Sequence, residues 1–253
     1  MLDFQTYCYL QNQKTGCTFV EEFLRNFSRE PLLAYDKHAI VASREASKFY
    51  FINVREPLAL YRSLFAYGVD GKGTVYLRLK ALGHERLYAR GPAGFSEWLR
   101  FVLDGRNALL LSNEYTPGVA RLAGLMTWRF FRLSVAGYEA AAPGFTHRAE
   151  MNRFVKAGYF MNAVLKQESL RQGLATLAQR ELASRLKNVD QALAWIEAAP
   201  PINVSESITQ ADEVAVDEDA MRLLFHKESQ LYHNFYPNAP GYAQSKSQPL
   251  EDV

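Results

Sequence analysis

The sequence FQTYCYLQNQKTGCTFVEEFLRNF, residues 4–27, decides the fold. Its first part, Phe4 to Leu10, is dense in aromatic residues, a composition typical of a buried strand. From Phe19 onward the apolar residues recur at the three- and four-residue spacing of an amphipathic helix. A polar turn separates the two parts. This order predicts a strand, a turn and a helix in direct succession.

The turn itself, Gln13-Lys14-Thr15-Gly16-Cys17-Thr18, has the chemistry of an anion site. A strand that passes through a tight turn into a helix aims several backbone N–H groups at one place, and the helix dipole adds positive potential there. Gly16 permits close approach of the main chain or a positive φ angle, and Lys14 can supply a full charge. The alternative is an ordinary loop in which Thr18 caps the helix. The Walker pattern is absent, because lysine precedes glycine and the upstream glycine is missing.

A second segment further along the chain also predicts a strand followed directly by a helix. Phe49 to Val54 is an aromatic and β-branched run that predicts a strand, and Arg55-Glu56-Pro57 follows it directly. Pro57 suits the first turn of a helix, and Gly68 suits its end. Arg55 is therefore expected at the carboxyl end of a central strand, the edge at which open α/β sheets bind ligands.

Together the two segments resemble the sulfotransferases that use 3′-phosphoadenylyl sulfate (PAPS). The matching residues are Lys14-Thr15-Gly16-Cys17-Thr18 and Arg55-Glu56-Pro57, with Ser63 eight positions beyond the arginine. The segment Ile52 to Leu58 is most similar to the carbohydrate sulfotransferases, the group that contains the heparan sulfate 2-O enzymes. The sequence departs from the family where Gln13 replaces a usual proline and Glu56 replaces aspartate. The Arg-Lys-Gly segment of the small-molecule enzymes is absent, which argues against a phenol or steroid acceptor.

The resemblance implies a fold and a set of roles. It implies a P-loop-like, three-layer α/β fold with a central parallel sheet flanked by helices, plus helical additions. Residues 1–237 would form one domain, and residues 238–253 a flexible C-terminal tail. Residues 14–18 would bind the 5′-phosphosulfate of PAPS, and Arg55 and Ser63 would bind its 3′-phosphate. The acceptor would be a hydroxyl of a carbohydrate or glycolipid, and the product nucleotide would be PAP.

Catalysis in this family needs positive charge at the leaving oxygen and a base for the acceptor hydroxyl. The resemblance places Lys14 at the leaving oxygen. It also places a catalytic base between the two phosphate motifs, and His38 is the candidate, with Asp36 and Glu45 as alternatives. No metal is expected, because Lys14 and Arg55 supply the positive charge.

Composition narrows the class of protein. The 253 residues are 48% hydrophobic with a formal net charge of +2, which favours neither disorder nor a nucleic-acid binder. No apolar run approaches the ~18 residues of a membrane span, and no signal peptide is recognisable. Golgi members of the resembled family carry a membrane anchor, so the resemblance implies a bacterial-type cytoplasmic enzyme here, with a shortened form of a longer chain as the alternative. Cys8 and Cys17 are the only cysteines, so no disulfide framework is expected, and packing is the expected role of Cys17.

Other elements follow from hydrophobic spacing and turn residues. We expect an edge strand near Ile40 and Val41, an inner strand within Tyr159–Leu165, a loop or linker at Tyr138–Gly144, and helices at Val75–Arg90, Phe95–Leu103, Pro117–Phe130, Leu170–Leu186, Leu193–Ala199 and Asp217–Phe235. Ile202–Ser207 resembles the Asn-x-Ser loop that precedes the last helix in carbohydrate sulfotransferases, which implies a loop near the nucleotide, and an ordinary polar turn is the alternative. Residues 75–90 are rich in basic side chains. Such a cluster is ordinarily a solvated face, and an acidic saccharide is the alternative partner.

Two other functions fit the same strand–turn–helix pattern. A P-loop-type nucleotide kinase would share it, but that class requires Gly-Lys-Ser/Thr and an aspartate at the end of a neighbouring strand for Mg²⁺. Here Val54 is followed by arginine. A non-catalytic nucleotide-binding protein could keep the fold without the chemistry, because folds outlast their activities.

Overall fold

A computed structural model describes residues 1–200 and 215–245. The chain divides into two compact units. Unit 1 comprises Met1–Arg55, Arg132–Ala136 and Gly158–Val204, and unit 2 comprises Glu56–Phe131, Gly137–Ala157 and Ser205–Val253. The secondary structure is mixed α/β, as expected. Among the described residues, no helix is both long and apolar enough to span a membrane.

Unit 1 is built on one mixed sheet of five strands in the order β3-β1-β2-β4-β5. The strands are β1 (Leu2–Asp3), β2 (Tyr7–Leu10), β3 (Ala34–Tyr35), β4 (Phe49–Val54) and β5 (Ala163–Lys166). β4 pairs in parallel with both β2 and β5, whereas β1 runs antiparallel to β2 and to β3. The register pairs Leu10 with Ile52, so the segments that follow β2 and β4 leave the same edge of the sheet.

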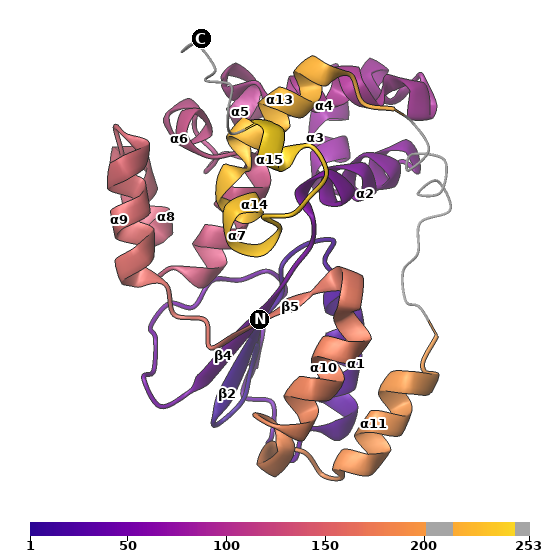
Figure 1. The fold of residues 1–253 in the computed structure, drawn as a ribbon, viewed down its shortest axis with the longest axis vertical. Coiled ribbons are helices and arrows are strands. Elements are labelled where there is room, and N and C mark those ends of the chain that lie inside the picture. Colours follow the sequence, from indigo (N-terminus) through magenta and orange to yellow (C-terminus); the bar gives the residue numbers. More distant parts are fainter. Residues whose placement is uncertain (201–214, 246–253) are drawn as a thin grey trace. The chain divides into compact units, whose positions relative to one another are not determined.

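Three helices of unit 1 cover one face of this sheet: α1 (Cys17–Phe27), α10 (Leu170–Gln179) and α11 (Val189–Ala198) (Figure 1). Side chains of alternate strand residues point into this layer, and the rings of Tyr9 and Phe51 stack there with centroids 4.9 Å apart. On α1 the buried residues include four of the predicted stripe (Phe19, Val20, Phe23 and Leu24), whereas Phe27 is half-buried. Trp195 of α11 packs against Phe19. Burial of these large side chains holds α1 against the sheet.

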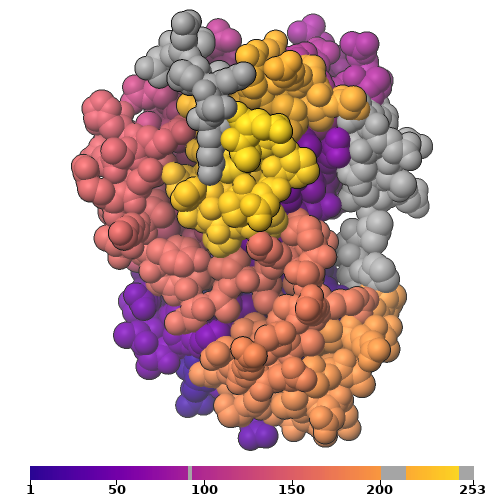
Figure 2. Space-filling model, viewed as in Figure 1, coloured from indigo at the N-terminus to yellow at the C-terminus, as the bar shows by residue number. Residues whose placement is uncertain are grey.

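Within its described residues, the regular secondary structure of unit 2 is all helical. Its α-helices are α2 (Pro57–Val69), α3 (Thr74–Ala81), α4 (Phe95–Leu103), α5 (Ala108–Leu111), α6 (Pro117–Leu122), α7 (Leu125–Ser134, whose last turn belongs to unit 1), α8 (Tyr138–Ala141), α9 (Arg148–Gly158), α13 (Glu218–Lys227), α14 (Ser229–Phe235) and α15 (Tyr242–Ser245). An aromatic cluster packs α2 against α4, with Phe65 and Trp98 at its centre. Helices α13 to α15 form one continuous patch of its surface (Figure 2).

The centre of unit 2 contains a fully buried carboxylate. Glu228 accepts hydrogen bonds from the Tyr61 hydroxyl (2.6 Å), the Thr127 hydroxyl (2.6 Å) and the backbone N–H groups of Met126 (3.1 Å) and Thr127 (2.8 Å). The last two belong to the first turn of α7, so the side chain of Glu228 caps this helix. Burial raises the pKa of the carboxyl group despite these four donors.

The predicted elements near the turn are confirmed, and several others are wrong. β2, α1, β4 and α2 lie where the sequence indicates. No strand forms at Ile40–Val41, because the edge strand β3 pairs earlier in the chain. The predicted helix Val75–Arg90 ends at Ala81, where Gly83 takes a φ angle of 80°. The predicted helix Pro117–Phe130 is divided into α6 and α7, and the carboxylate of Glu228 caps the N-terminus of α7.

Three further expectations differ in detail. Tyr138–Gly144 forms α8 and a 3₁₀ turn instead of a loop. Of the expected C-terminal tail, residues 238–245 include α15, in which the hydroxyl of Tyr242 donates to the Ser229 carbonyl (3.1 Å). Residues 246–253 and the expected loop Ile202–Ser207 lie outside the described residues.

Candidate anion-binding and active site

The turn between β2 and α1 has the backbone shape that the sequence indicated. β2 ends at Leu10, and α1 begins at Cys17 with Gly16 as its N-cap. Gly16 has a φ angle of 79°, and a Cβ atom at this position would lie 2.6 Å from Cδ2 of Leu170. Only glycine meets both conditions without strain. The alternative in which Thr18 caps the helix is therefore not the one adopted.

The φ angle of the backbone alternates in sign along this turn. Lys14 has a φ angle of 61° and Gly16 one of 79°, whereas Thr15 between them is not among the residues with positive φ. Consecutive residues of opposite hand make successive N–H groups converge, and such a nest is a concavity that binds anions. The N-terminus of α1 lies at the same place and adds the positive end of its dipole. The turn thus fits a phosphate or sulfate group.

Buried side chains hold the turn in this shape. The hydroxyl of Thr15 donates to the carbonyl of Asn12 (2.8 Å), and the side-chain amide of Asn53 donates to the carbonyl of Thr15 (2.9 Å). The amide of Asn12 in turn donates to the carbonyl of Asn53 (3.3 Å). All three side chains are buried. Sequence reasoning missed Asn12 and Asn53, although a polar residue inside the apolar strand β4 is a signal in itself, because buried amides are kept where they form hydrogen bonds.

Arg55 reaches the turn from the end of β4. Its Nη1 atom donates to the carbonyl of Lys14 (3.4 Å). The carbonyls of Lys14 and Thr15 are therefore both directed at residues at the end of β4. Because C=O and N–H point in opposite directions across a trans peptide, the N–H groups of Thr15 and Gly16 point away from those contacts. The turn therefore has backbone N–H groups on one side, while its carbonyl groups on the other side accept hydrogen bonds from Asn53 and Arg55.

His38 also contacts this segment. Its Nδ1 atom lies 2.7 Å from the carbonyl oxygen of Gln11, the residue that follows β2. His38 and Lys14 are the only non-glycine residues with positive φ within residues 1–200 and 215–245. Backbone strain of this kind persists where the surroundings enforce it and is common at functional sites. The structure thus brings His38, Lys14 and Arg55 to one edge of the sheet.

A polar network supports Gln11 from the side of α1. The side-chain amide of Gln11 donates to Glu21 (2.7 Å), which also accepts from Arg25 (2.9 Å) and from the hydroxyl of Tyr35 (3.3 Å). Burial opposes ionisation of Glu21, but these hydrogen bonds together lower the pKa of its carboxyl group below the ordinary value. The network fixes the orientation of the segment that carries the His38 contact.

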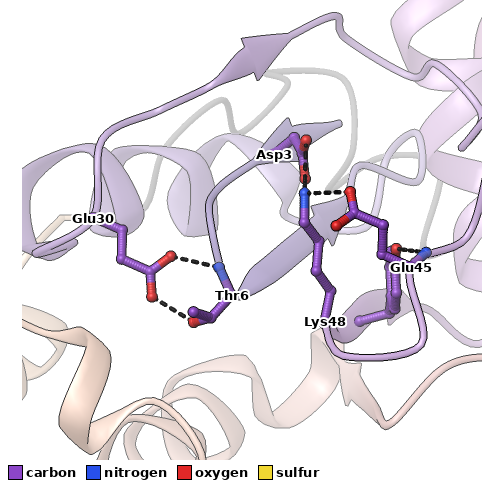
Figure 3. Close-up of polar contacts among 6 residues, drawn as sticks. Asp3, Thr6, Glu30, Glu45 and Lys48 are labelled. Atoms are coloured by element: carbon purple, nitrogen blue, oxygen red, sulfur yellow. Dashed lines mark hydrogen bonds and ion pairs between the residues drawn. The ribbon is translucent and has the colours of Figure 1, made fainter.

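Glu45, an alternative to His38 as base, lies at the other edge of the sheet. Lys48 precedes β4, and its buried ammonium group lies 3.0 Å from Glu45 and 2.9 Å from Asp3 (Figure 3). The six residues of β4, about 20 Å of strand, separate Lys48 from Arg55. The carboxylate of Glu45 thus forms a structural ion pair away from Lys14. Asp36, the other alternative, is exposed two residues before His38.

The remaining predicted residues have these places. Cys17 is buried in the core of unit 1, where burial raises the pKa of its thiol, so it packs as expected. Thr18 is half-buried in the first turn of α1. Ser63 belongs to unit 2 and is buried in α2, and its contact with a 3′-phosphate stays a prediction.

Glu56, the residue that replaces the usual aspartate, has a clear structural role. Its carboxylate caps α2 by accepting from the N–H of Ala59 (2.7 Å), and the hydroxyl of Tyr232 donates to it as well.

Comparisons with known proteins do not assign this chain to a family. A scan of protein-family models finds no match, and searches of curated proteins and of solved structures find no significant match.

Proposed function

We propose that this protein is a PAPS-dependent sulfotransferase that acts on a hydroxyl group of a carbohydrate or glycolipid. One observation carries the proposal: the nest at Lys14–Gly16 lies at the same sheet edge as Arg55 and His38, joined to them by hydrogen bonds to the carbonyls of Lys14 and Gln11. An anion site, a guanidinium group and an imidazole are the groups that sulfuryl transfer needs. The proposal includes the P-loop-like, three-layer arrangement typical of that class.

Each residue has a distinct task in this proposal. Bound PAPS would supply the activated sulfuryl group. The N–H groups of residues 15–18 hold sulfate and phosphate oxygens, and Lys14 stabilises the negative charge that develops on the leaving oxygen. A donor aimed at such developing charge contributes on the order of 3 kcal/mol. Arg55 binds the 3′-phosphate, the role that the family resemblance also gives to Ser63.

His38 is the proposed base. A carbonyl oxygen can only accept, so the contact with Gln11 requires the hydrogen on Nδ1. In the neutral ring, Nε2 is then the basic nitrogen that removes the proton of the acceptor hydroxyl. Such proton transfer contributes ~10²–10⁴-fold to the rate.

The kinase alternative finds less support in the residues at the sheet edge. A P-loop kinase places a carboxylate at the end of the neighbouring strand, whereas β4 ends with Asn53 and Val54 and is followed by Arg55. The side-chain amide of Asn53 already donates a hydrogen bond to the carbonyl of Thr15. A cationic side chain at this position suits a second phosphate group of the ligand.

Thermal-shift titration of the whole chain with PAP, AMP, ATP and GDP tests the proposal. We expect a shift with PAP and little with AMP, which lacks the 3′-phosphate. A shift with ATP or GDP but none with PAP would overturn the proposal in favour of another nucleotide-binding function. Transfer of labelled sulfate from PAPS to a panel of saccharides and glycolipids then separates an enzyme from a binding protein.

A further inference from the structure

We propose that the face of unit 2 formed by α3 and α5 docks on an anionic lipid surface. The proposal is independent of the sulfotransferase function, because it concerns residues 70–109 and needs no nucleotide. Two properties of this face carry it: exposed leucines and an excess of positive charge.

The leucines are the first property. Leu77 of α3 is 58% exposed, Leu82 at the end of α3 is 49% exposed, and Leu109 of α5 is 48% exposed. Half of the six large hydrophobic side chains that are exposed within the described residues therefore belong to these two helices or to the residue that directly follows α3. Single exposed leucines are ordinary on a protein surface, but a group of them on neighbouring elements marks an interaction surface.

A set of hydrogen bonds keeps these elements together. The guanidinium of Arg78 donates to the carbonyl of Leu109 (2.8 Å) and to that of Leu110 (3.1 Å). It thereby satisfies carbonyl groups of the short helix α5, which packs against α3. Exposed leucines are therefore carried by two elements that pack together, Leu77 on α3 and Leu109 on α5.

Charge is the second property. Residues 70–90 contain five basic side chains (Lys72, Arg78, Lys80, Arg86 and Arg90) and two acidic ones (Asp70 and Glu85). Five minus two gives this segment a net charge of +3, which is larger than the net charge of +2 of the whole chain. Lys72 and Arg86 are exposed, and neither forms an ion pair with a described residue. Lys72 lies two residues before α3, and Arg86 lies in the 3₁₀ turn Glu85–Tyr88, which packs against α3. Exposed leucines and cations on adjoining elements favour an anionic lipid surface, because acyl chains take up the leucines and headgroups attract the cations. An acidic polysaccharide would satisfy the charges alone.

Vesicle flotation with the whole chain tests this inference. The probes are vesicles of phosphatidylcholine alone and of phosphatidylcholine mixed with phosphatidylglycerol. We expect binding to the mixed vesicles that weakens as salt is added, and little binding to the neutral ones. Removing one cation near an anionic membrane weakens binding roughly fivefold, so K72Q/R86Q should lose about 25-fold. The variant L77S/L109S should lose at least about tenfold.

Matched variants keep the test specific. Leu33 in unit 1 is as exposed as Leu77, at 58%, so L33S should bind as the wild type does. Arg153 and Lys156 are exposed on α9 of unit 2, and R153Q/K156Q serves as the charge control. Equal losses in the control and patch variants would overturn the proposal. So would binding to dextran sulfate without binding to mixed vesicles, which would assign the cations to a polysaccharide.

Discussion

The Nδ1 atom of His38 lies 2.7 Å from the carbonyl oxygen of Gln11, the first residue after β2. This contact fixes one of the two neutral tautomers of the ring, because the carbonyl requires a hydrogen on Nδ1. It also ties the imidazole to the segment that continues into the anion-binding turn. A histidine held in this way has its basic nitrogen set by geometry, as a general base requires.

The first prediction concerns His38. We expect H38A to lower turnover of sulfate transfer by ~10²–10⁴-fold while PAP affinity changes little, because the ring removes a proton and does not hold the nucleotide. Turnover from labelled PAPS and PAP affinity by calorimetry check the two parts. H147A, at a histidine outside the candidate site, is the control. A loss of PAP affinity equal to the loss of rate would show that His38 is structural.

The second prediction concerns the two cations. K14A and R55A should each remove most transfer activity, with a loss on the order of 10²-fold or more, since each removes charge that faces a phosphate or the leaving oxygen. R55A should also weaken PAP binding more than AMP binding, because the 3′-phosphate is its proposed partner. Wild-type turnover in either variant would contradict the assignment. K187Q, at an exposed lysine after the 3₁₀ turn Ala183–Arg185, is the control.

A third prediction concerns Asn53, which sequence reasoning did not select. N53L nearly keeps the side-chain volume but removes the donor to the Thr15 carbonyl, which is left buried without that hydrogen bond. The amide of Asn12 keeps its acceptor, because it donates to the backbone carbonyl of residue 53. We expect a loss of about 1–3 kcal/mol in the free energy of unfolding and weaker PAP binding. Denaturant unfolding and calorimetry measure the two effects. Unchanged values in both would show that the turn keeps its shape without Asn53.

The elements around the site could be predicted because their signals are local. Aromatic and β-branched runs mark β2 and β4, and Pro57 marks the start of α2. The elements that sequence reasoning misplaced depend on distant partners. The break before α7 exists because Glu228, about a hundred residues away, caps its N-terminus. No spacing pattern within Pro117–Phe130 carries that information.

The charged residues of the site could be predicted from the sequence, but the buried amides that hold the turn in shape could not. Lys14, Gly16 and Arg55 follow from motif chemistry at the ends of predicted strands. The supports Asn12 and Asn53 act through contacts between residues 38 or 41 positions apart, and amides at such positions have no fixed spacing. Only the structure distinguishes the candidates for the base, because it places Glu45 in an ion pair with Lys48 at the opposite end of β4 from Arg55.

A fourth prediction uses the pH dependence of a helix cap. The N–H of Ala220 donates to Asp217 (2.9 Å), and this bond, together with Arg100, lowers the pKa of the carboxyl group below its ordinary value of 3.8. A lowered folded-state pKa stabilises the fold above the unfolded value, and the contribution disappears as pH falls through the folded value. D217A should therefore cost about 1 kcal/mol at neutral pH and less in acid. Thermal unfolding across pH checks this, with D190A as the control.

The last prediction concerns the buried carboxylate of unit 2. E228A would leave four donors without their acceptor, among them the hydroxyls of Tyr61 and Thr127, and each buried unsatisfied group costs about 1–3 kcal/mol. We expect a loss of at least ~3 kcal/mol in the free energy of unfolding. G124A should destabilise by a similar route, because its Cβ would lie 2.1 Å from a carboxylate oxygen of Glu228. G144A is the matched control, since nothing lies within 4 Å of a Cβ there. Equal stability of G124A and G144A would mean that the carboxylate moves aside without loss of its hydrogen bonds.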